Sequence, residues 1–309
     1  MEYRELGKTG LKVSVLSYGA AGLGRIYGTP DEVRGIRTVH AAIDHGINLI
    51  DTSPLYGGTK SESALGKALK EIPRDKYYLA TKVGRYAGGI SDFSAERIVQ
   101  SMDESLMRLG LDYVDIFQCH DIDYVSLDQI VNEALPTLRR LQEQGKTRFV
   151  GITGFPLKVY TSVLNRADVD TVLSFCHYML NDKSFESLVP FLKQKGVGMI
   201  NASPLGMGLF KERGPAKGHP ATEKIKRICA EVVTFCKERG EDISKLAMQF
   251  GLANPDFATT LVGTTRTEHL KDNIDWLESP IDEGLLAEVL EILKPIQNTT
   301  WTRGLSENN

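Results

Sequence analysis

Short apolar runs alternate with longer amphipathic segments along most of the chain. The apolar runs have the length of β-strands, and the segments between them carry apolar residues at helical spacing. The runs predict strands over residues Val15–Gly19, Ile47–Asp51, Tyr77–Lys82, Tyr113–Gln118, Phe149–Thr153, Thr171–Phe175, Val197–Ala202 and Thr259–Val262. The amphipathic segments predict helices over residues Pro30–His45, Ser61–Leu69, Ser94–Leu109, Ser126–Gln144, Leu157–Arg166, Phe185–Lys195 and Ser244–Ala253.

Strict alternation of strands and helices is typical of a parallel β-sheet with helical crossovers. Eight such units are also enough to close a barrel, so we predict an α/β fold, a (β/α)₈ TIM barrel, in which residues 1–309 form a single domain. A doubly wound sheet is the alternative, but regular units without a long break favour closure. Two strand-like runs around Gly7–Gly10 predict an N-terminal β-hairpin, and an extra C-terminal helix is expected.

Two segments lack any periodicity. Residues Gly206–Glu223 are rich in Gly, Pro and Lys and follow the seventh predicted strand, which suits a mobile flap over the active face. The tail, Lys294–Asn309, is expected to be partly ordered at best.

The composition is that of an ordinary globular protein, with 41% hydrophobic and 25% charged residues. The net charge of −3 and the lack of a basic patch do not favour nucleic acid or an anionic membrane surface. The apolar runs are too short for a transmembrane helix and Met1–Glu5 lacks the regions of a signal peptide, so we expect a cytoplasmic protein. Its four cysteines, expected to be free thiols, are Cys119, Cys176, Cys229 and Cys236.

Four polar residues fall at the ends of three successive predicted strands. Asp51 and Tyr56 follow one strand, Lys82 ends the next, and His120 follows the third. Because the carboxyl ends of barrel strands share the face that holds the active site, we expect the four to converge. Each has an ordinary structural explanation, such as a turn cap for Asp51 or a core histidine for His120. A lysine inside an apolar strand, however, requires a charged partner.

The chemistry of this set fits proton transfer to a carbonyl during hydride transfer. A free tyrosine has a pKa near about 10, and a nearby ammonium lowers it. Lys82 can supply the ammonium and Asp51 can hold it in place, while His120 can orient the carbonyl. We therefore predict Tyr56 as the acid–base residue.

The motifs around these residues make the chain similar to the aldo-keto reductase superfamily from about residue 2 to 275. The motifs are Gly46–Gly57, Ala80–Lys82, Leu109–Asp115 and Val262–Leu270. This resemblance implies a barrel, NAD(P)H, and a catalytic tetrad of Asp51, Tyr56, Lys82 and His120. Further strings, at Asp51–Thr59, Cys119–Ile122, Cys176–Tyr178 and Asn201–Leu209, resemble the L-galactose-oxidising branch of the superfamily. That branch implies NAD-dependent oxidation of an aldose at C1 to the lactone, with Tyr56 accepting the hydroxyl proton.

The resemblance also assigns residues to the cofactor site. They are Gly19, Ala20, Thr153, Ser203, Leu205, Gly208, Gly263, Thr264, Thr265, Arg266, His269 and Asn273. A helix N-terminus after the last strand can bind phosphate, and NADP needs a cation for its additional phosphate. Arg266 can supply that cation, whereas Gly263 and His269 stand where many NADP-using members carry Lys and Arg. NAD is therefore the expected cofactor, with NADP as the alternative.

Three departures make the nicotinamide pocket unlike that of common reductases. Thr153-Gly154 replaces Ser-Asn, Phe175 replaces a frequent Gln, and Ala202 replaces a stacking Tyr. The residues predicted to contact the substrate are Tyr56, His120, His177 and Asn181. The doublets Cys119-His120 and Cys176-His177 could bind zinc in principle, but adjacent strand residues point oppositely, so no metal site is predicted.

Three functions stay open at this point. The first is a sugar 1-dehydrogenase, the second an NADPH-dependent general aldehyde or ketone reductase, and the third a nucleotide-binding regulatory subunit without catalysis. The intact tetrad weighs against the third, and polar residues Asp121, Asp123, His177 and Asn181 favour a hydroxylated substrate over an apolar aldehyde. The expected partner is a small-molecule aldose or aldehyde, and the expected state is a monomer or small homo-oligomer.

Overall fold

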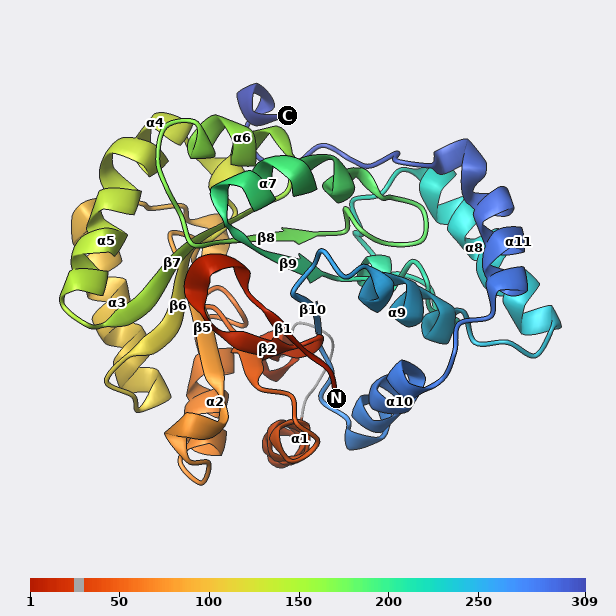
Figure 1. Ribbon diagram of the computed structural model, residues 1–309, viewed down its shortest axis with the longest axis horizontal. Helices are drawn as coiled ribbons and strands as arrows, with labels where there is room; N and C mark the ends of the chain where they lie inside the picture. Colours follow the sequence, from red (N-terminus) through yellow and green to blue (C-terminus); the bar gives the residue numbers. More distant parts are fainter. Residues whose placement is uncertain (25–30) are drawn as a thin grey trace.

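The computed structural model describes residues 1–24 and 31–309, and the predicted helix start at Pro30 lies outside them. Parallel strands close into a barrel in the order β10-β3-β4-β5-β6-β7-β8-β9 (Figure 1). The strands are β3 (Leu16–Gly19), β4 (Leu49–Asp51), β5 (Tyr78–Val83), β6 (Val114–Cys119), β7 (Thr147–Gly154), β8 (Thr171–Phe175), β9 (Gly198–Ala202) and β10 (Thr259–Val262). The closed barrel confirms the predicted fold class and excludes the doubly wound sheet.

Helices surround the barrel, as Figure 1 shows. Those that follow β3 to β8 are α1 (Glu32–Asp44), α2 (Lys60–Leu69), α3 (Ala95–Leu109), α4 (Leu127–Gln129), α5 (Leu135–Glu143), α6 (Lys158–Leu164) and α7 (Val189–Lys195). Helix α3 illustrates why the segments are helical: Ser94 caps its first turn, and Ile98, Met102 and Leu109 recur on its buried face. The single helix predicted over Ser126–Gln144 is α4 and α5, joined by a π-helical turn at Ile130–Ala134.

Two helices lie between β9 and β10, where we predicted one. They are α8 (Glu223–Glu238) and α9 (Ile243–Ala253). The omission of α8 was an error of interpretation, because Ile225, Ile228 and Val232 already show helical spacing in the sequence. The chain then continues through α10 (Thr267–Glu278) and α11 (Glu283–Leu293), which lies beside α8 (Figure 1) and is the predicted extra helix.

The N-terminal hairpin closes one end of the barrel. Strands β1 (Tyr3–Glu5) and β2 (Lys12–Ser14) pair antiparallel, as predicted. Leu6, Leu11 and Val13 are buried against inward-facing strand residues. The Lys8 N–H donates to the Gly196 carbonyl at 2.9 Å, just before β9 begins, so the hairpin covers the N-terminal end of the strands. The opposite end, where the strands finish, is left for chemistry.

A buried carboxylate ties three strands together at the hairpin end. Asp115, the second residue of β6, is fully buried. Its oxygens accept hydrogen bonds from Arg74 Nη2 at 2.6 Å and Arg148 Nη1 at 2.7 Å. The Leu79 N–H donates to the same carboxylate at 2.8 Å. These charge-assisted bonds join β5, β6 and the start of β7.

The tail after α11 is ordered, so the expectation of partial order at best was wrong. Trp301 is buried and stacks on Phe155, with ring centroids 5.0 Å apart and an interplanar angle of 25°. The Leu305 N–H and Asn308 Nδ2 donate to the Asp123 carbonyl at 2.8 and 3.0 Å. All of these partners are remote in sequence, so the periodicity of the tail itself gave no sign of them.

The tail passes so close to Asp123 that Gly304 should be essential for its order. A Cβ at Gly304 (φ +75°) would lie 2.3 Å from the Asp123 carbonyl oxygen, whereas Gly240 (φ +76°) has nothing within 4 Å. In a Trp276→Phe background, Trp301 is the remaining tryptophan. We expect Gly304→Ala to shift its fluorescence to longer wavelength as the tail detaches, and Gly240→Ala to leave it unchanged. Equal spectra for the two variants would contradict this account of the tail.

Candidate active site

The four predicted residues lie together at the C-terminal ends of β4, β5 and β6. Lys82 is buried in β5 and donates hydrogen bonds from Nζ to Asp51 Oδ1, to the Thr52 carbonyl at 2.9 Å and to Tyr56 Oη at 3.2 Å. One ammonium therefore connects the carboxylate to the phenol. Its charge favours the phenolate form of the tyrosine.

His120 contacts the same phenol from the end of β6. The imidazole ring lies edge-on to Tyr56, with centroids 5.6 Å apart, and its Nδ1 is 2.9 Å from Ser53 Oγ. Ser53 Oγ already accepts the Leu55 N–H at 3.1 Å, so its own hydrogen is available to donate to Nδ1. When Ser53 donates to Nδ1, the proton of the neutral imidazole lies on Nε2. Burial lowers the pKa of His120 to about 3, against the opposing effect of Asp121, so the ring is neutral at physiological pH.

Gln118 provides a further hydrogen bond to the Asp51 carboxylate. We did not predict this residue from the sequence. Its Nε2 donates to Asp51 Oδ2 at 3.2 Å, so both Asp51 oxygens have partners. Burial raises the pKa of Asp51, and the Lys82 ammonium acts against that shift. Gln118 lies opposite Lys82 in the register of β5 and β6. A polar residue two positions before His120, on the same face of the strand, was the signal that could have identified it.

Backbone strain is concentrated at this end of the barrel. Three non-glycine residues with positive φ begin the loops after β6, β8 and β9: Asp121 (50°), Cys176 (58°) and Ser203 (60°). Such conformations cost on the order of 1–3 kcal/mol each and gather at functional sites. These loops carry His177, Asn181 and several of the predicted cofactor contacts.

The two predicted sugar contacts are buried and incompletely hydrogen bonded. His177 Nδ1 is 2.9 Å from Ser184 Oγ. His177 Nε2 and both amide atoms of Asn181 have no partner in the part of the chain that the structure describes. The same holds for Trp301 Nε1, which the tail brings to this region. Buried polar atoms are nearly always bonded, so these four atoms are candidates for contacts with a bound ligand.

Two other acidic residues are occupied by the tail. Asp121, expected to face a hydroxylated substrate, instead forms an ion pair with Arg303 at 2.6 Å. Asp123 accepts the Phe155 N–H at 3.1 Å through its side chain and anchors the tail through its carbonyl. The sequence analysis therefore missed Arg303 and Trp301, because their role depends on docking of a segment without periodicity.

Several predicted cofactor residues surround the junction of β10 and α10. Gly19 ends β3 and Ala20 follows it. A Cβ at Gly263 would lie 3.0 Å from the Gly19 carbonyl oxygen, so the ends of β3 and β10 are close together. The Thr264 carbonyl accepts the Tyr18 hydroxyl at 2.7 Å. Arg266 stands at the N-cap of α10 without a side-chain cap hydrogen bond. The N–H groups of the first turn, which includes Thr267 and His269, are thus suited to a phosphate.

A second cation lies near this helix start. Burial and Arg213 lower the pKa of Lys211, and partial burial together with Lys211 and Arg266 lowers the pKa of His269. Lys211 lies in the loop after β9, next to the segment with Ser203, Leu205 and Gly208, and the sequence analysis did not single it out. The site therefore carries more positive charge than Arg266 alone supplies.

The departures near the nicotinamide have structural reasons. A Cβ at Gly154 would lie 2.9 Å from Val159, so a longer residue does not fit there without movement. Thr153 Oγ1 accepts the Asp121 N–H at 2.8 Å, so this hydroxyl connects the loop after β6 to the end of β7. Phe175 packs on Phe155, with centroids 5.1 Å apart, and contributes to an aromatic wall.

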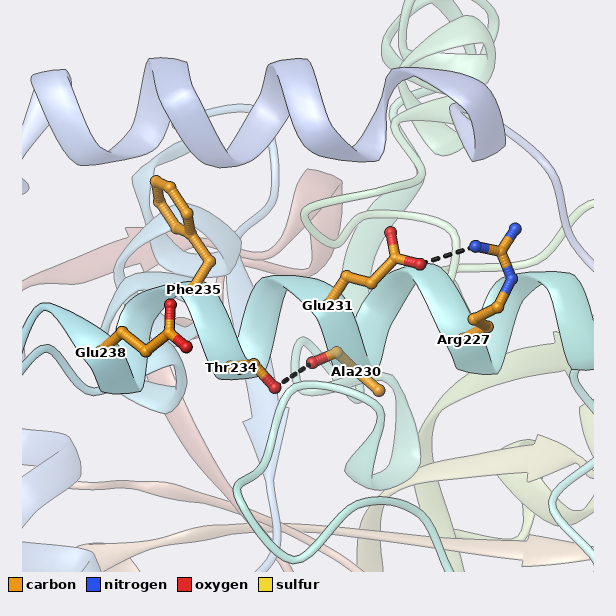
Figure 2. A pocket seen from close by; sticks show the side chains of 6 residues that line it. All are labelled: Arg227, Ala230, Glu231, Thr234, Phe235 and Glu238. Carbon is orange, nitrogen blue, oxygen red and sulfur yellow. Dashed lines mark hydrogen bonds and ion pairs between the residues drawn. The ribbon is translucent and has the colours of Figure 1, made fainter.

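Two concave regions differ in the elements that line them. A groove of about 970 Å³ between the tail and the loop after β9 is lined by Tyr124, Met207, Pro220, Trp301 and Arg303, among others. A shallower hollow of about 430 Å³ lies along α8 (Figure 2), where Arg227 pairs with Glu231 at 2.6 Å. None of the four tetrad residues lines either region, but Trp301 and Arg303 of the tail line the groove, whereas the hollow is lined by residues of α8 alone.

The cysteine–histidine doublets do not have the character of a zinc site. Burial raises the pKa of the Cys119 thiol, and raises that of Cys176 to about 12, so neither is readily a thiolate. Among residues 1–24 and 31–309, no group of three His, Cys, Asp or Glu side chains is placed to hold a metal ion. Within the same residues, no helix combines the length and apolar character needed to cross a membrane.

Comparisons with known proteins give matches along the whole length of the chain. Residues 15–294 match the sequence model of the Aldo/keto reductase family. The chain is 50% identical over 317 residues to L-galactose dehydrogenase of Arabidopsis thaliana, covering 100% of this chain and 99% of the relative. It is 30% identical over 319 residues to D-arabinose 1-dehydrogenase of Saccharomyces cerevisiae, covering 95% and 94%. A solved aldo-keto reductase from Bacillus halodurans, in its holo form, has a TM-score of 0.79 at 26% identity and covers 98% of each chain. The resemblance predicted from the motifs is confirmed.

The buried pair makes a prediction about stability. Asp51→Asn leaves the Lys82 ammonium buried without its carboxylate, which should lower the free energy of unfolding by about 3–5 kcal/mol in urea denaturation. Adding Lys82→Met to that variant should restore most of the loss. As a control, Lys237→Met removes an exposed pair with Glu212 and should leave stability close to wild type. An Asp51→Asn variant as stable as the wild type would show that the pair does not hold the site.

Proposed function

The chain belongs to the aldo/keto reductase family of oxidoreductases, and from this premise we propose that it oxidises an aldose resembling L-galactose at C1 to the lactone. Its similarity to two sugar dehydrogenases, the L-galactose and D-arabinose enzymes, supports an aldose substrate. Enzymes of this family use nicotinamide cofactors, and NAD is the cofactor that we propose here. When bound, NAD supplies the acceptor for the hydride.

The observation that carries the proposal is the position of Lys82 between Asp51 and Tyr56. The ammonium, 3.2 Å from the phenolic oxygen, stabilises the phenolate, which accepts the proton of the C1 hydroxyl as hydride leaves C1 with its electron pair. Asp51 holds Lys82 in place through the hydrogen bond from Nζ to Oδ1. Neutral His120 orients the sugar by donating from Nε2 to its oxygen. In the reverse direction Tyr56 returns the proton to the carbonyl oxygen.

A hydroxylated substrate is supported by the unpaired polar atoms on the loop after β8 and on the tail. Asn181 offers a donor and an acceptor, and His177 and Trp301 offer one further nitrogen each. An apolar aldehyde would leave these buried groups unsatisfied, which costs about 1–3 kcal/mol for each group. We therefore propose that His177 and Asn181 bind sugar hydroxyls and that Trp301 contributes to the same pocket.

The cofactor proposal depends on the start of α10. The uncapped N–H groups at this helix terminus suit a phosphate, and Arg266 and Lys211 supply positive charge beside it. Gly263 and Thr264 lie at the preceding turn, which is narrow because the ends of β3 and β10 approach closely. The additional cation keeps NADP as the alternative, in which Arg266 would contact the 2′-phosphate.

The thiols support our proposal for the cellular setting of the enzyme. All four cysteines are unpaired and buried, which suits a reducing compartment, and we place the enzyme in the cytoplasm. A monomer or small homo-oligomer remains our prediction for its assembly.

Tyr56→Phe tests both the activity and the mechanism. Aldoses are offered with NAD and with NADP, and reduced nicotinamide is followed by absorbance. Because the variant lacks the proton acceptor, kcat should fall by about 10²–10⁴-fold, while nucleotide affinity, measured by fluorescence titration, stays as in the wild type. Tyr3→Phe, in the remote hairpin, serves as the control. A fully active Tyr56→Phe variant would refute the acid–base assignment, and NADPH-driven aldehyde reduction without sugar oxidation would favour the second function.

Arg266→Ala tests how the nucleotides are distinguished. Losing a charge-assisted bond to phosphate should raise the Kd of NADP by about tenfold or more, and that of NAD much less. Lys271→Ala, which removes an exposed cation of the same helix, is the matched control. Equal losses for NAD and NADP would exclude a 2′-phosphate contact for Arg266.

A further inference from the structure

The tail brings a guanidinium to the loop that carries His120. Arg303 donates from Nη2 to Asp121 Oδ2 at 2.6 Å and from Nε to Tyr124 Oη at 3.1 Å. Its guanidinium also lies over the Phe175 ring, 4.9 Å from the centroid. Arg303 is thus fixed on three sides, and its charge is directed at one oxygen of Asp121.

Asp121 lies between this guanidinium and the candidate catalytic histidine. Its second oxygen, Oδ1, is 4.0 Å from His120 Nε2. The Asp121 backbone is held with φ +50°, and its N–H donates to Thr153 Oγ1 at 2.8 Å. The backbone of Asp121 is thus fixed. A small rotation of its side chain is enough for the carboxylate to interact with the imidazole instead of the guanidinium.

The other groups that face His120 come from three further elements. Tyr56 and Ser53 approach from the loop after β4, Lys82 from β5 and Arg85 from the loop after β5. Lys82, Arg85 and Arg303 itself are cations and oppose a charge on the imidazole. Asp51 is already paired with Lys82. Asp121 is therefore the carboxylate placed to favour an imidazolium at His120.

We propose that Arg303 is a positioning residue, which holds Asp121 and thereby lowers the pH at which His120 gains a second proton. This inference depends on the proposed function, since it concerns the histidine assigned there to orient the sugar. Without the guanidinium, Asp121 loses its close cation and interacts with the imidazole instead. An opposite charge at this distance typically raises a histidine pKa by about 1–3 units. The imidazolium that forms at acidic pH would stabilise the Tyr56 phenolate further and make it a weaker base.

The direct test is a titration of His120 by ¹⁵N NMR of histidine-labelled protein, without sugar or nucleotide. The His120 signal is assigned by its loss in His120→Gln. In the wild type we expect the neutral Nε2–H form throughout pH 4.5–8, since burial lowers the pKa to about 3. In Arg303→Gln the midpoint should rise by about 1–3 units. Arg303→Lys, which keeps the charge, should behave as the wild type, and so should Glu307→Gln, an exposed charge on the same tail.

A double variant decides whether Asp121 mediates the effect. Arg303→Gln with Asp121→Asn should return His120 to wild-type behaviour. This holds even if the tail detaches, which Trp301 fluorescence reports, because a shift caused by solvent exposure would persist in the double variant. A persistent shift would overturn the proposal, as would an unchanged His120 in Arg303→Gln.

Turnover provides a separate readout that distinguishes this inference from the proposed function. If aldoses are oxidised, the acidic limb of the pH profile of kcat/KM should move to higher pH in Arg303→Gln and not in Arg303→Lys. If no aldose is oxidised by the wild type, the proposed function fails, while the NMR titration still supports or refutes the role of Arg303.

Discussion

A buried ammonium that must keep its carboxylate is the constraint on which this site depends. Strands β4 and β5 are neighbours in the barrel, with Asp51 opposite Ala80 in the register. Lys82 stands two residues further along β5, on the same face as Ala80, so its side chain reaches the end of β4 where Asp51 lies. The desolvation of both charges is costly, and full hydrogen bonding of the pair limits that cost. The pair therefore fixes the position of the Lys82 ammonium beside Tyr56.

The C-terminal ends of the barrel strands and the loops that follow them form the mouth of the barrel. Its other residues are arranged around the fixed charge of Lys82. His120 stays neutral, Asp121 is engaged by the tail, and the unpaired polar atoms lie on the loop after β8 and on the tail. Positive charge lies separately at the start of α10, which is suited to bind a dinucleotide phosphate. Proton transfer, sugar recognition and nucleotide binding are thus assigned to different strand ends of one barrel face.

The sequence predicted what local patterns and strand order determine. Strand-length apolar runs in regular alternation were enough for the barrel, and the position of Lys82 inside one of them was enough to expect a carboxylate nearby. Helix α8 was visible in the pattern but overlooked. Arg303, Trp301 and Lys211 were not predictable in the same way, because their neighbours are set by how the tail and the loop after β9 fold back over the barrel. That information is tertiary and leaves no periodic signal in one sequence.

The buried Asp115 cluster at the hairpin end has a consequence for how this enzyme can change. Arg74, Arg148 and the Leu79 amide stabilise the strands there, at the opposite end of β6 from His120. Substitutions in the mouth loops therefore leave this cluster intact. Such a separation confers evolvability. Substrate preference can diversify by mutation at one end of the barrel while the other end maintains the scaffold. Libraries of variants restricted to the mouth should therefore retain a high proportion of folded members.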